Sequence, residues 1–560
     1  MNTLIYKISV GLVLLLSLFS CVSEKEKVKG PFVDVIDFRE EQDEIEGVLI
    51  KRVYTDGGIE TKTIASPDWT VELQPFVDAD FNKPANSSKF TRTETESKLS
   101  NWREVTWQSI DEKTSVKWAV YRFVDSTCVG ASIRVNRTSA AYTFSEILTY
   151  VPNSGYSIEN EQDLRTLDSN SFYLSGELEG KPQPWRIFFD IGPHNIPVNF
   201  WWSPVSDGVK LTFTQGKEEL TVVALKTDSG YIAEMPVFQS YLKFERNGDE
   251  LIGTFHNLDR GPNYEVAFIA NKRTYDQSFG YDPTALGPDF SGKWETYFYD
   301  EGDSSAAIGM FERFGDDLIG TFATETGDYR FLQGKVVGDS FYLSTFDGSH
   351  LFLFTGKIVG DAILDGHFYS GNHYHTTWTA KRNEAFELRD PNSMTSLSDA
   401  KSEIDFSFPD LKGNLVSLSD AKYQGKVVIL QVLGSWCPNC VDETRYFTEL
   451  YSKYNSDGLE IIGLGFERSP EFDMAKITLS KAIADLDVPY SVLVAGTPKE
   501  SAKALPMITP IKSYPTSIFI NRKGEVVKIH TGFYGPSTGK YYNDYCAETE
   551  LFVAELLNEK

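Results

Sequence analysis

The chain has 560 residues, with 54 Lys and Arg against 80 Asp and Glu, which gives a formal net charge of −26. A chain of this length holds several domains of ordinary size. Its acidity argues against nucleic acid as a partner, because phosphate binding needs concentrated Lys and Arg. Its five cysteines are too few for a fold that depends on disulfide bonds for its stability.

Residues 1–20 have the pattern of a secretory signal peptide. Lys7 precedes an apolar run, Ile8–Phe19, that is too short to remain as a membrane-spanning helix. The sequence Leu18-Phe19-Ser20-Cys21 resembles the bacterial lipoprotein box, which implies that Cys21 is acylated and anchors the mature chain to a membrane. The alternative is an ordinary secreted protein in which Cys21 has no role. Residues 21–44 are polar and suit a flexible tether.

Residues 45–166 and 170–383 form two regions with alternating apolar and polar residues, which predicts antiparallel β-sheet. The second region contains an internal repeat, Phe244–Phe255 against Phe311–Phe322, in which Gly-Asp separates two halves. This dipeptide predicts a hairpin turn, since glycine accepts a positive φ. We therefore expect a meander of hairpins that closes into a barrel or sandwich. A linker at 384–402 follows.

The sequence Trp436-Cys437-Pro438-Asn439-Cys440 follows the apolar run Val427–Leu433. A strand that leads into this motif at the start of a helix puts the first sulfur at the helix N-terminus, where unpaired N–H groups and the helix dipole favour a thiolate. Cys437 is therefore the predicted nucleophile. Cys440 is the predicted resolving cysteine, which attacks the mixed disulfide and leaves a Cys437–Cys440 bond.

Half of a zinc site has the same Cys-x-x-Cys spacing, but it needs two further ligands. The other cysteines, Cys21, Cys128 and Cys546, stand alone in the sequence, and His530 is the only histidine after His375. We therefore favour dithiol chemistry and predict neither a metal nor a cofactor.

From residue 403 to 560 the chain resembles the thioredoxin superfamily, and more closely the TlpA/ResA-like thiol-disulfide oxidoreductases that work outside the bacterial cytoplasm. The match is carried by Cys437–Cys440, by Ile404–Gly413 and by Tyr514–Asn521. The resemblance implies an α/β thioredoxin-like domain. It also implies a cis bond between Tyr514 and Pro515 that faces the dithiol, and a free backbone at Tyr514 that pairs with an extended substrate.

Thioredoxins carry a buried acid six residues before the first cysteine, and here that position is Gln431. Glu443 shares a helix face with Cys440, and the resemblance to the ResA-like branch implies an active-site acid at this position. We predict Glu443 as the candidate base for Cys440, with a solvated helix residue as the alternative. Trp436 is predicted to form an apolar platform beside the dithiol, with simple packing as the alternative.

Few other residues in the sequence are candidates for a metal-binding, ligand-binding or redox role. His367, His373 and His375 form a cluster in which a metal or ligand site is conceivable, although histidines in an aromatic sheet are more often solvated or hydrogen-bonded. Cys128 and Cys546 are predicted to be reduced and silent, with a disulfide between them as the alternative.

These patterns predict a multidomain, membrane-anchored thiol-disulfide oxidoreductase. The TlpA/ResA resemblance implies protein disulfide reduction, with disulfide-containing exported proteins as clients and a membrane thiol reductant as the electron source. Pro438 also occurs in oxidising members, so the direction of electron flow stays open. The β-rich regions look like the N-terminal parts of some Bacteroidota lipoproteins, and the expected location is the cell envelope, on the periplasmic side of the outer membrane.

Two other functions compete with this prediction. The first is a cell-envelope binding or assembly lipoprotein, in which the thioredoxin-like unit is a docking module. The second is a peroxiredoxin, whose reactive cysteine is expected in a Pro-x-x-x-Thr-x-x-Cys context; here Gly434-Ser435-Trp436 precedes Cys437 instead.

Overall fold

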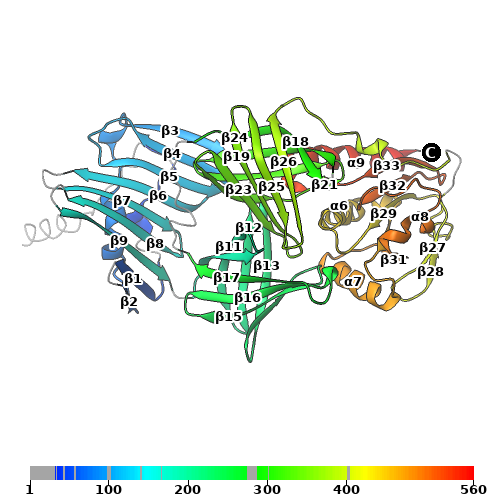
Figure 1. The fold of residues 1–560 in the computed structure, drawn as a ribbon, viewed down its shortest axis with the longest axis horizontal. Coiled ribbons are helices and arrows are strands. Elements are labelled where there is room, and N and C mark those ends of the chain that lie inside the picture. Colours follow the sequence, from blue (N-terminus) through cyan, green and yellow to red (C-terminus); the bar gives the residue numbers. More distant parts are fainter. Residues whose placement is uncertain are drawn as a thin grey trace, which may run out of the picture.

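β-Sheet dominates the structure up to Arg382, and an α/β domain follows, as Figure 1 shows. The computed structural model describes residues 32–559, except 33, 42–44, 56–57, 98–101, 139–141, 165–166, 179, 274–286, 301 and 400–403. The predicted signal peptide, Cys21 and most of the tether lie outside the described residues. The arrangement confirms the predicted fold class, with β-rich N-terminal units before a thioredoxin-like domain.

The first β unit is a nine-stranded antiparallel sheet in the order β2-β1-β9-β8-β7-β6-β5-β4-β3. Three short helices, α2 (Phe38–Glu41), α3 (Trp69–Glu72) and α4 (Gln74–Asp78), share one apolar core with this sheet. Strand β9 extends the sheet beyond the predicted boundary at residue 166, because it pairs with both β1 and β8. The strands are β1 (Leu49–Thr55), β2 (Gly58–Ile64), β3 (Phe90–Glu96), β4 (Trp102–Ser109), β5 (Val116–Val124), β6 (Thr127–Thr138), β7 (Tyr142–Val151), β8 (Gly155–Leu164) and β9 (Leu167–Leu178).

The second β unit, called the first barrel, is a closed eight-stranded barrel. Each strand pairs with the next along the chain, and the last pairs back with the first. Side chains alternate along the strands, and the inward set packs into one aromatic and aliphatic core. The strands are β10 (Gln183–Asp190), β11 (Asn195–Val205), β12 (Gly208–Gln215), β13 (Glu218–Thr227), β14 (Gly230–Glu234), β15 (Ser240–Asn247), β16 (Glu250–Asn257) and β17 (Glu265–Lys272).

The third β unit, called the second barrel, closes through a pairing of β19 with β20. A short strand, β21 (Gly327–Asp328), folds back on the end of β20. The other strands are β18 (Gly292–Asp300), β19 (Asp303–Phe314), β20 (Asp317–Thr324), β22 (Leu332–Val337), β23 (Ser340–Phe346), β24 (Leu351–Val359), β25 (Ala362–Ser370) and β26 (Tyr374–Arg382).

The internal repeat forms the same hairpin in each barrel, β15–β16 in the first and β19–β20 in the second. The turn glycines, Gly248 and Gly315, have φ values of +62° and +57°, where a side chain is strained. The second glycine of each repeat lies opposite a phenylalanine whose side chain would overlap a Cβ. These pairs are Phe244 with Gly253 and Phe311 with Gly320.

Phe346 of the second barrel is buried inside the first barrel, where its ring lies 5.1 Å from those of Phe189 and Phe213. We expect Phe346→Ala to lower the free energy of unfolding by about 3–5 kcal/mol, because it leaves a cavity where the two barrels meet. Urea unfolding checks this value. Val359→Ala is the matched control, since Val359 is 52% exposed in the same barrel, and an equal loss in both variants would contradict the prediction.

The C-terminal domain has a five-stranded sheet in the order β31-β30-β29-β32-β33. Its central strand, β29 (Val427–Leu433), is buried along its whole length. Helices α6 (Pro438–Tyr454), α7 (Phe472–Asp485) and α9 (Lys540–Asn558) share a core with one face, and the hairpin β27–β28 and the segment around α8 pack on the other. The remaining elements are β27 (Ser407–Pro409), β28 (Leu415–Ser417), β30 (Leu459–Phe466), β31 (Ser491–Gly496), α8 (Ser501–Ala504), β32 (Thr516–Ile520) and β33 (Val526–Thr531).

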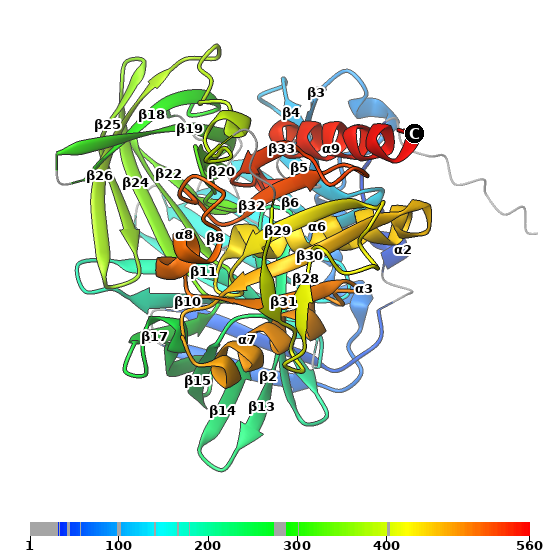
Figure 2. The same ribbon diagram turned by 90° about the vertical axis from the view of Figure 1, so that its right-hand side faces the viewer.

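The four units are packed together. Seen from its C-terminal end in Figure 2, the thioredoxin-like domain lies in front of the β units, with the strands of the second barrel beside β33 and α9. Within the described ranges, no helix combines the length and the apolar character needed to cross a membrane.

Candidate active site at the start of helix α6

Cys437 is the N-cap residue of α6. Its sulfur accepts a hydrogen bond from the backbone N–H of Cys440 at 3.4 Å, and such a donor at a helix start favours a thiolate. The same sulfur lies 3.3 Å from the carbonyl oxygen of Tyr514, to which it donates as a thiol. Both cysteines are free thiols, with 7% of Cys437 and 1% of Cys440 exposed. The geometry therefore separates an outer sulfur from an inner one.

The loop before β32 faces this pair. The peptide bond between Tyr514 and Pro515 is cis. The ring of Tyr514 meets that of Trp436 edge to face, with centroids 5.5 Å apart. Trp436 is held by a 3.0 Å hydrogen bond from Nε1 to the carbonyl oxygen of Phe466. The three residues predicted to contact a substrate, Trp436, Tyr514 and Pro515, thus lie around Cys437.

Glu443 is fully buried beneath the dithiol. Its carboxylate accepts hydrogen bonds from Gln431 at 3.0 Å, Ser517 at 2.8 Å and Tyr545 at 3.4 Å. Burial raises the pKa of Glu443 to about 7, against the opposite effect of these donors. Gln431 of β29 occupies the position of the buried acid expected in thioredoxins. In this chain the buried acid is Glu443 on α6, and the side-chain amide of Gln431 donates a hydrogen bond to it. A carboxyl group with this pKa exchanges its proton near neutral pH, as a general base requires.

Cys440 lies in the same buried environment. Burial is the main reason that the pKa of the Cys440 thiol is well above its ordinary value, and the neighbouring Cys437 and Glu443 raise it further. Because the thiolate is the nucleophile, such a thiol reacts only after a base removes its proton. Glu443 lies one turn after Cys440 on α6 and acts on its thiol electrostatically, which makes it the candidate base for that proton.

Glu467, directly after β30, is a second buried carboxylate at the site, and sequence reasoning missed it. It accepts hydrogen bonds from the backbone N–H and the hydroxyl of Ser435, at 2.9 and 2.7 Å, and from the hydroxyl of Thr478 at 3.0 Å. Burial raises its pKa. The only sequence signal for this residue is a charge placed directly after the apolar strand Leu459–Phe466. Its contacts fix the loop that leads into Cys437.

The other predicted candidates lie elsewhere. Cys128, in the first sheet, and Cys546, on α9, are half-buried free thiols whose pKa values burial raises to about 11. His367 and His375 are neighbours on β25 and β26, with Nδ1 and Nε2 3.1 Å apart, whereas His373 hydrogen-bonds to the first barrel. In the part of the chain that the structure describes, no group of three His, Cys, Asp or Glu is placed to hold a metal ion.

A Cys-x-x-Cys pair at a helix start, beside a cis-proline loop and above a buried carboxyl group, defines a thiol-disulfide oxidoreductase of thioredoxin-like fold. The family described as Redoxin matches residues 399–543. The thiol-disulfide oxidoreductase ResA of Bacillus subtilis strain 168 is 31% identical over 137 residues, which cover 24% of this chain and 69% of that protein. The chain therefore belongs to the ResA family of thiol-disulfide oxidoreductases, which confirms the resemblance seen in its sequence.

Other relatives match the same fraction of the chain. ResA of Halalkalibacterium halodurans is 30% identical over 131 residues, 23% of this chain and 66% of that protein. The chain thus spans about two thirds of the length of the curated relatives it matches. Similar solved structures include a thioredoxin family thiol:disulfide interchange protein of Chlorobium tepidum, 20% identical over 31% of this chain and 100% of that one, with a TM-score of 0.23. A putative DsbE of Chlorobium tepidum is 26% identical over 28% and 99%, with a TM-score of 0.22.

Proposed function

We propose that the chain is a membrane-anchored protein disulfide reductase of the bacterial cell envelope, which cycles Cys437 and Cys440 between a dithiol and a disulfide. The observation that carries the proposal is the Cys437 sulfur, which lies between the N–H of Cys440 and the carbonyl of Tyr514. An outer nucleophile and an inner, protonated partner are the two groups that a two-step disulfide exchange needs.

In the first step the Cys437 thiolate attacks one sulfur of a client disulfide and expels the other as a thiolate. Glu443 then takes the proton of Cys440, and the Cys440 sulfur attacks the Cys437 sulfur. The mixed disulfide breaks, the second client sulfur leaves, and a Cys437–Cys440 bond forms. The client gains two electrons and two protons overall. A membrane thiol reductant, the second proposed partner, returns two electrons and two protons to the Cys437–Cys440 pair.

Trp436, Tyr514 and Pro515 are the proposed substrate contacts. An extended client segment pairs with the backbone at Tyr514, next to the Cys437 sulfur, and the two aromatic rings supply apolar contact. The proposed clients are exported proteins, because disulfides persist outside the cytoplasm.

The proposed anchor is a lipid on Cys21, with the chain on the periplasmic side of the outer membrane. The support is the sequence of residues 1–21 alone, and acyl chains give stable anchoring when more than one is attached. The full-length chain is expected to enter the detergent phase on Triton X-114 partitioning and Cys21→Ala the aqueous phase. Equal partitioning of the two would contradict the anchor.

The test of the redox proposal is the reduction potential of the Cys437–Cys440 pair, in a soluble chain that starts after Cys21. A value near that of thioredoxin, about −270 mV, supports a reductase, whereas a value near about −120 mV makes the protein an oxidant. If no Cys437–Cys440 disulfide forms in any thiol buffer, the proposed function is wrong.

A further inference from the structure

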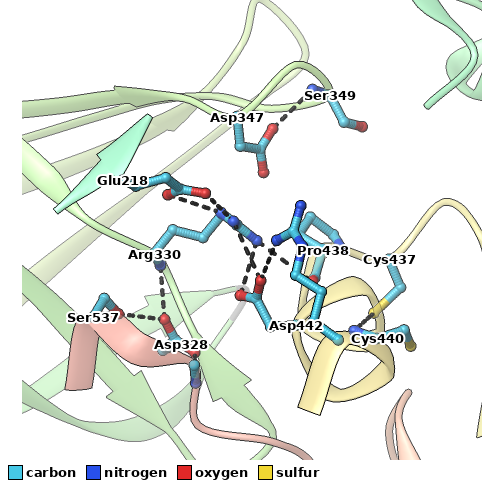
Figure 3. Close-up of polar contacts among 12 residues, drawn as sticks. Glu218, Asp328, Arg330, Asp347, Ser349, Cys437, Pro438, Cys440, Asp442 and Ser537 are labelled. Carbon is cyan, nitrogen blue, oxygen red and sulfur yellow. Dashed lines mark hydrogen bonds and ion pairs between the residues drawn. The ribbon is translucent and has the colours of Figure 1, made fainter. Parts of the chain in front are cut away.

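The second barrel reaches the active-site turn through Arg330, as Figure 3 shows. Arg330 lies between β21 and β22 and is buried. Its guanidinium pairs with Asp442 of α6 at 3.0 Å and with Glu218 of the first barrel. One of its nitrogens also lies 3.4 Å from the carbonyl oxygen of Pro438, between the two cysteines. One side chain thus connects both barrels to the Cys-Pro-Asn-Cys turn.

The loop around Arg330 is held by contacts of its own. The carboxylate of Asp328 accepts hydrogen bonds from the backbone N–H of Arg330 at 2.9 Å and from that of Gly535 at 2.7 Å. Gly327 lies so close to the side chain of Asn439 that a Cβ would overlap it. Arg330 itself has a φ of +61°, which is unusual for a residue with a side chain. The loop that carries Arg330 therefore packs against the Cys-Pro-Asn-Cys turn, and the Arg330 side chain points toward that turn.

The charges at this contact depend on Arg330. Burial raises the pKa of Asp442 to about 6, and Arg330 is the largest influence in the opposite direction, ahead of Arg445. Without Arg330, the carboxylates of Asp442, Glu218 and Asp328 would lie beside the first turns of α6, and the exposed Arg445, which pairs with Asp442, would be the nearest arginine. Negative charge at this place disfavours a thiolate at the helix start.

We infer that Arg330 is a positioning residue for the dithiol: it holds the Pro438 carbonyl, neutralises Asp442 and so sets the reactivity of Cys437. The inference rests on the proposed redox function of Cys437 and Cys440. It makes the β-rich region a part of the active site, because a side chain of the second barrel completes the surroundings of the cysteine pair.

Arg330→Met, in the full chain after Cys21, removes the charge and the hydrogen bonds and keeps most of the side-chain volume. We expect the equilibrium constant for oxidation of the dithiol by glutathione disulfide to rise about tenfold, which is a potential about 30 mV more negative. The physical reason is that the loss of a nearby cation destabilises a thiolate, which only the reduced form can contain. Alkylation of Cys437 at neutral pH is expected to slow by a similar factor, and its pH profile to move to higher pH.

Asp442→Asn, with Arg330 intact, is expected to shift the equilibrium constant and the alkylation profile in the opposite direction, because it leaves the cation and removes the anion. Opposite shifts distinguish a charge effect from a general loss of structure. This second variant also keeps the inference testable if Arg330→Met does not fold. Arg330→Lys keeps the charge and is expected to recover part of the wild-type behaviour.

The matched control is Arg122→Met. Arg122 is also a buried arginine between two acids, Glu104 at 3.0 Å and Asp317 at 3.6 Å, where the first sheet meets the second barrel. We expect this variant to lower the melting temperature and to leave the potential and the alkylation profile unchanged. An unchanged potential and profile in folded Arg330→Met would overturn the inference. A wild type that forms no Cys437–Cys440 disulfide would instead overturn the proposed function.

Discussion

Cys440→Ser is expected to stop the reaction at the mixed disulfide, so that a client stays covalently attached to Cys437. The hydroxyl of serine does not attack a disulfide, and Cys440 is the second cysteine of the pair and the more buried one. Turnover should fall on the order of 10³-fold or more, in the range seen when a member of a catalytic unit is removed. Insulin serves as the disulfide substrate, and a non-reducing gel with mass spectrometry identifies the adduct.

Cys437→Ser should form no adduct at the dithiol and show no turnover, because the remaining cysteine of the pair, Cys440, is 1% exposed. Cys546→Ser is the matched control, a half-buried thiol of the same domain, and should keep full turnover. An adduct on Cys440 in Cys437→Ser, located by mass spectrometry, would reverse the assigned roles. Client binding unaffected by Cys437→Ser, together with a wild type that does not cycle, would favour the alternative of a cell-envelope binding lipoprotein.

Glu443→Gln is expected to slow the resolving step by about 10²-fold above pH 7, the scale of a lost general base, and to leave the first step intact. In the wild type this step should accelerate as the pH rises through about 7, since protonated Glu443 cannot accept the Cys440 proton. The acceleration should be absent in the variant. Ellman's reagent separates the steps, because Cys437 releases the first thionitrobenzoate and Cys440 the second.

Stability gives an independent check on Glu443. Its folded-state pKa of about 7 lies above the ordinary value of 4.5, so the folded state binds the proton more tightly. The wild-type free energy of unfolding should therefore decline between about pH 4.5 and 7 and be level above that range. Glu443→Gln has no carboxyl proton to lose, so its decline in urea titrations should be smaller than that of the wild type, with the part due to other raised carboxyls such as Asp442 retained.

The control for both measurements is Glu467→Gln, which changes a buried carboxyl that contacts Ser435. This variant should keep the acceleration of the resolving step near pH 7. If the acceleration disappears in Glu467→Gln and persists in Glu443→Gln, the base is Glu467.

Short patterns in the sequence predict much of this site. The strand Val427–Leu433 and the Cys-Pro-Asn-Cys turn are adjacent in the chain, so their geometry follows from local rules of helix starts. The repeated Gly-Asp likewise predicts turns at Gly248 and Gly315. The closure of two barrels does not follow from such rules, because it depends on pairings such as β10 with β17 between strands far apart in sequence.

The charged residues that surround the dithiol were harder to predict. Nothing in the sequence distinguishes Arg330, Glu218 and Glu467 from ordinary surface residues, since most charged side chains are solvated. The contacts of Arg330 appear only when separate units meet, as Glu218 of one barrel and Arg330 of the other meet Asp442 of α6. The burial of Glu467 depends on Ser435 and Thr478, which are distant from it in the sequence. The partners of Glu443 are scattered in the same way over β29, β32 and α9.

The order of the units along the molecule determines where the dithiol lies relative to the first sheet. The first sheet and the thioredoxin-like domain lie at opposite ends in Figure 1, with both barrels between them. Phe346 of the second barrel packs inside the first, and Arg330 pairs with Glu218 of the first barrel and Asp442 of α6, so buried contacts join both barrels to each other and to α6. The length of the two barrels therefore sets the distance between the dithiol and the first sheet.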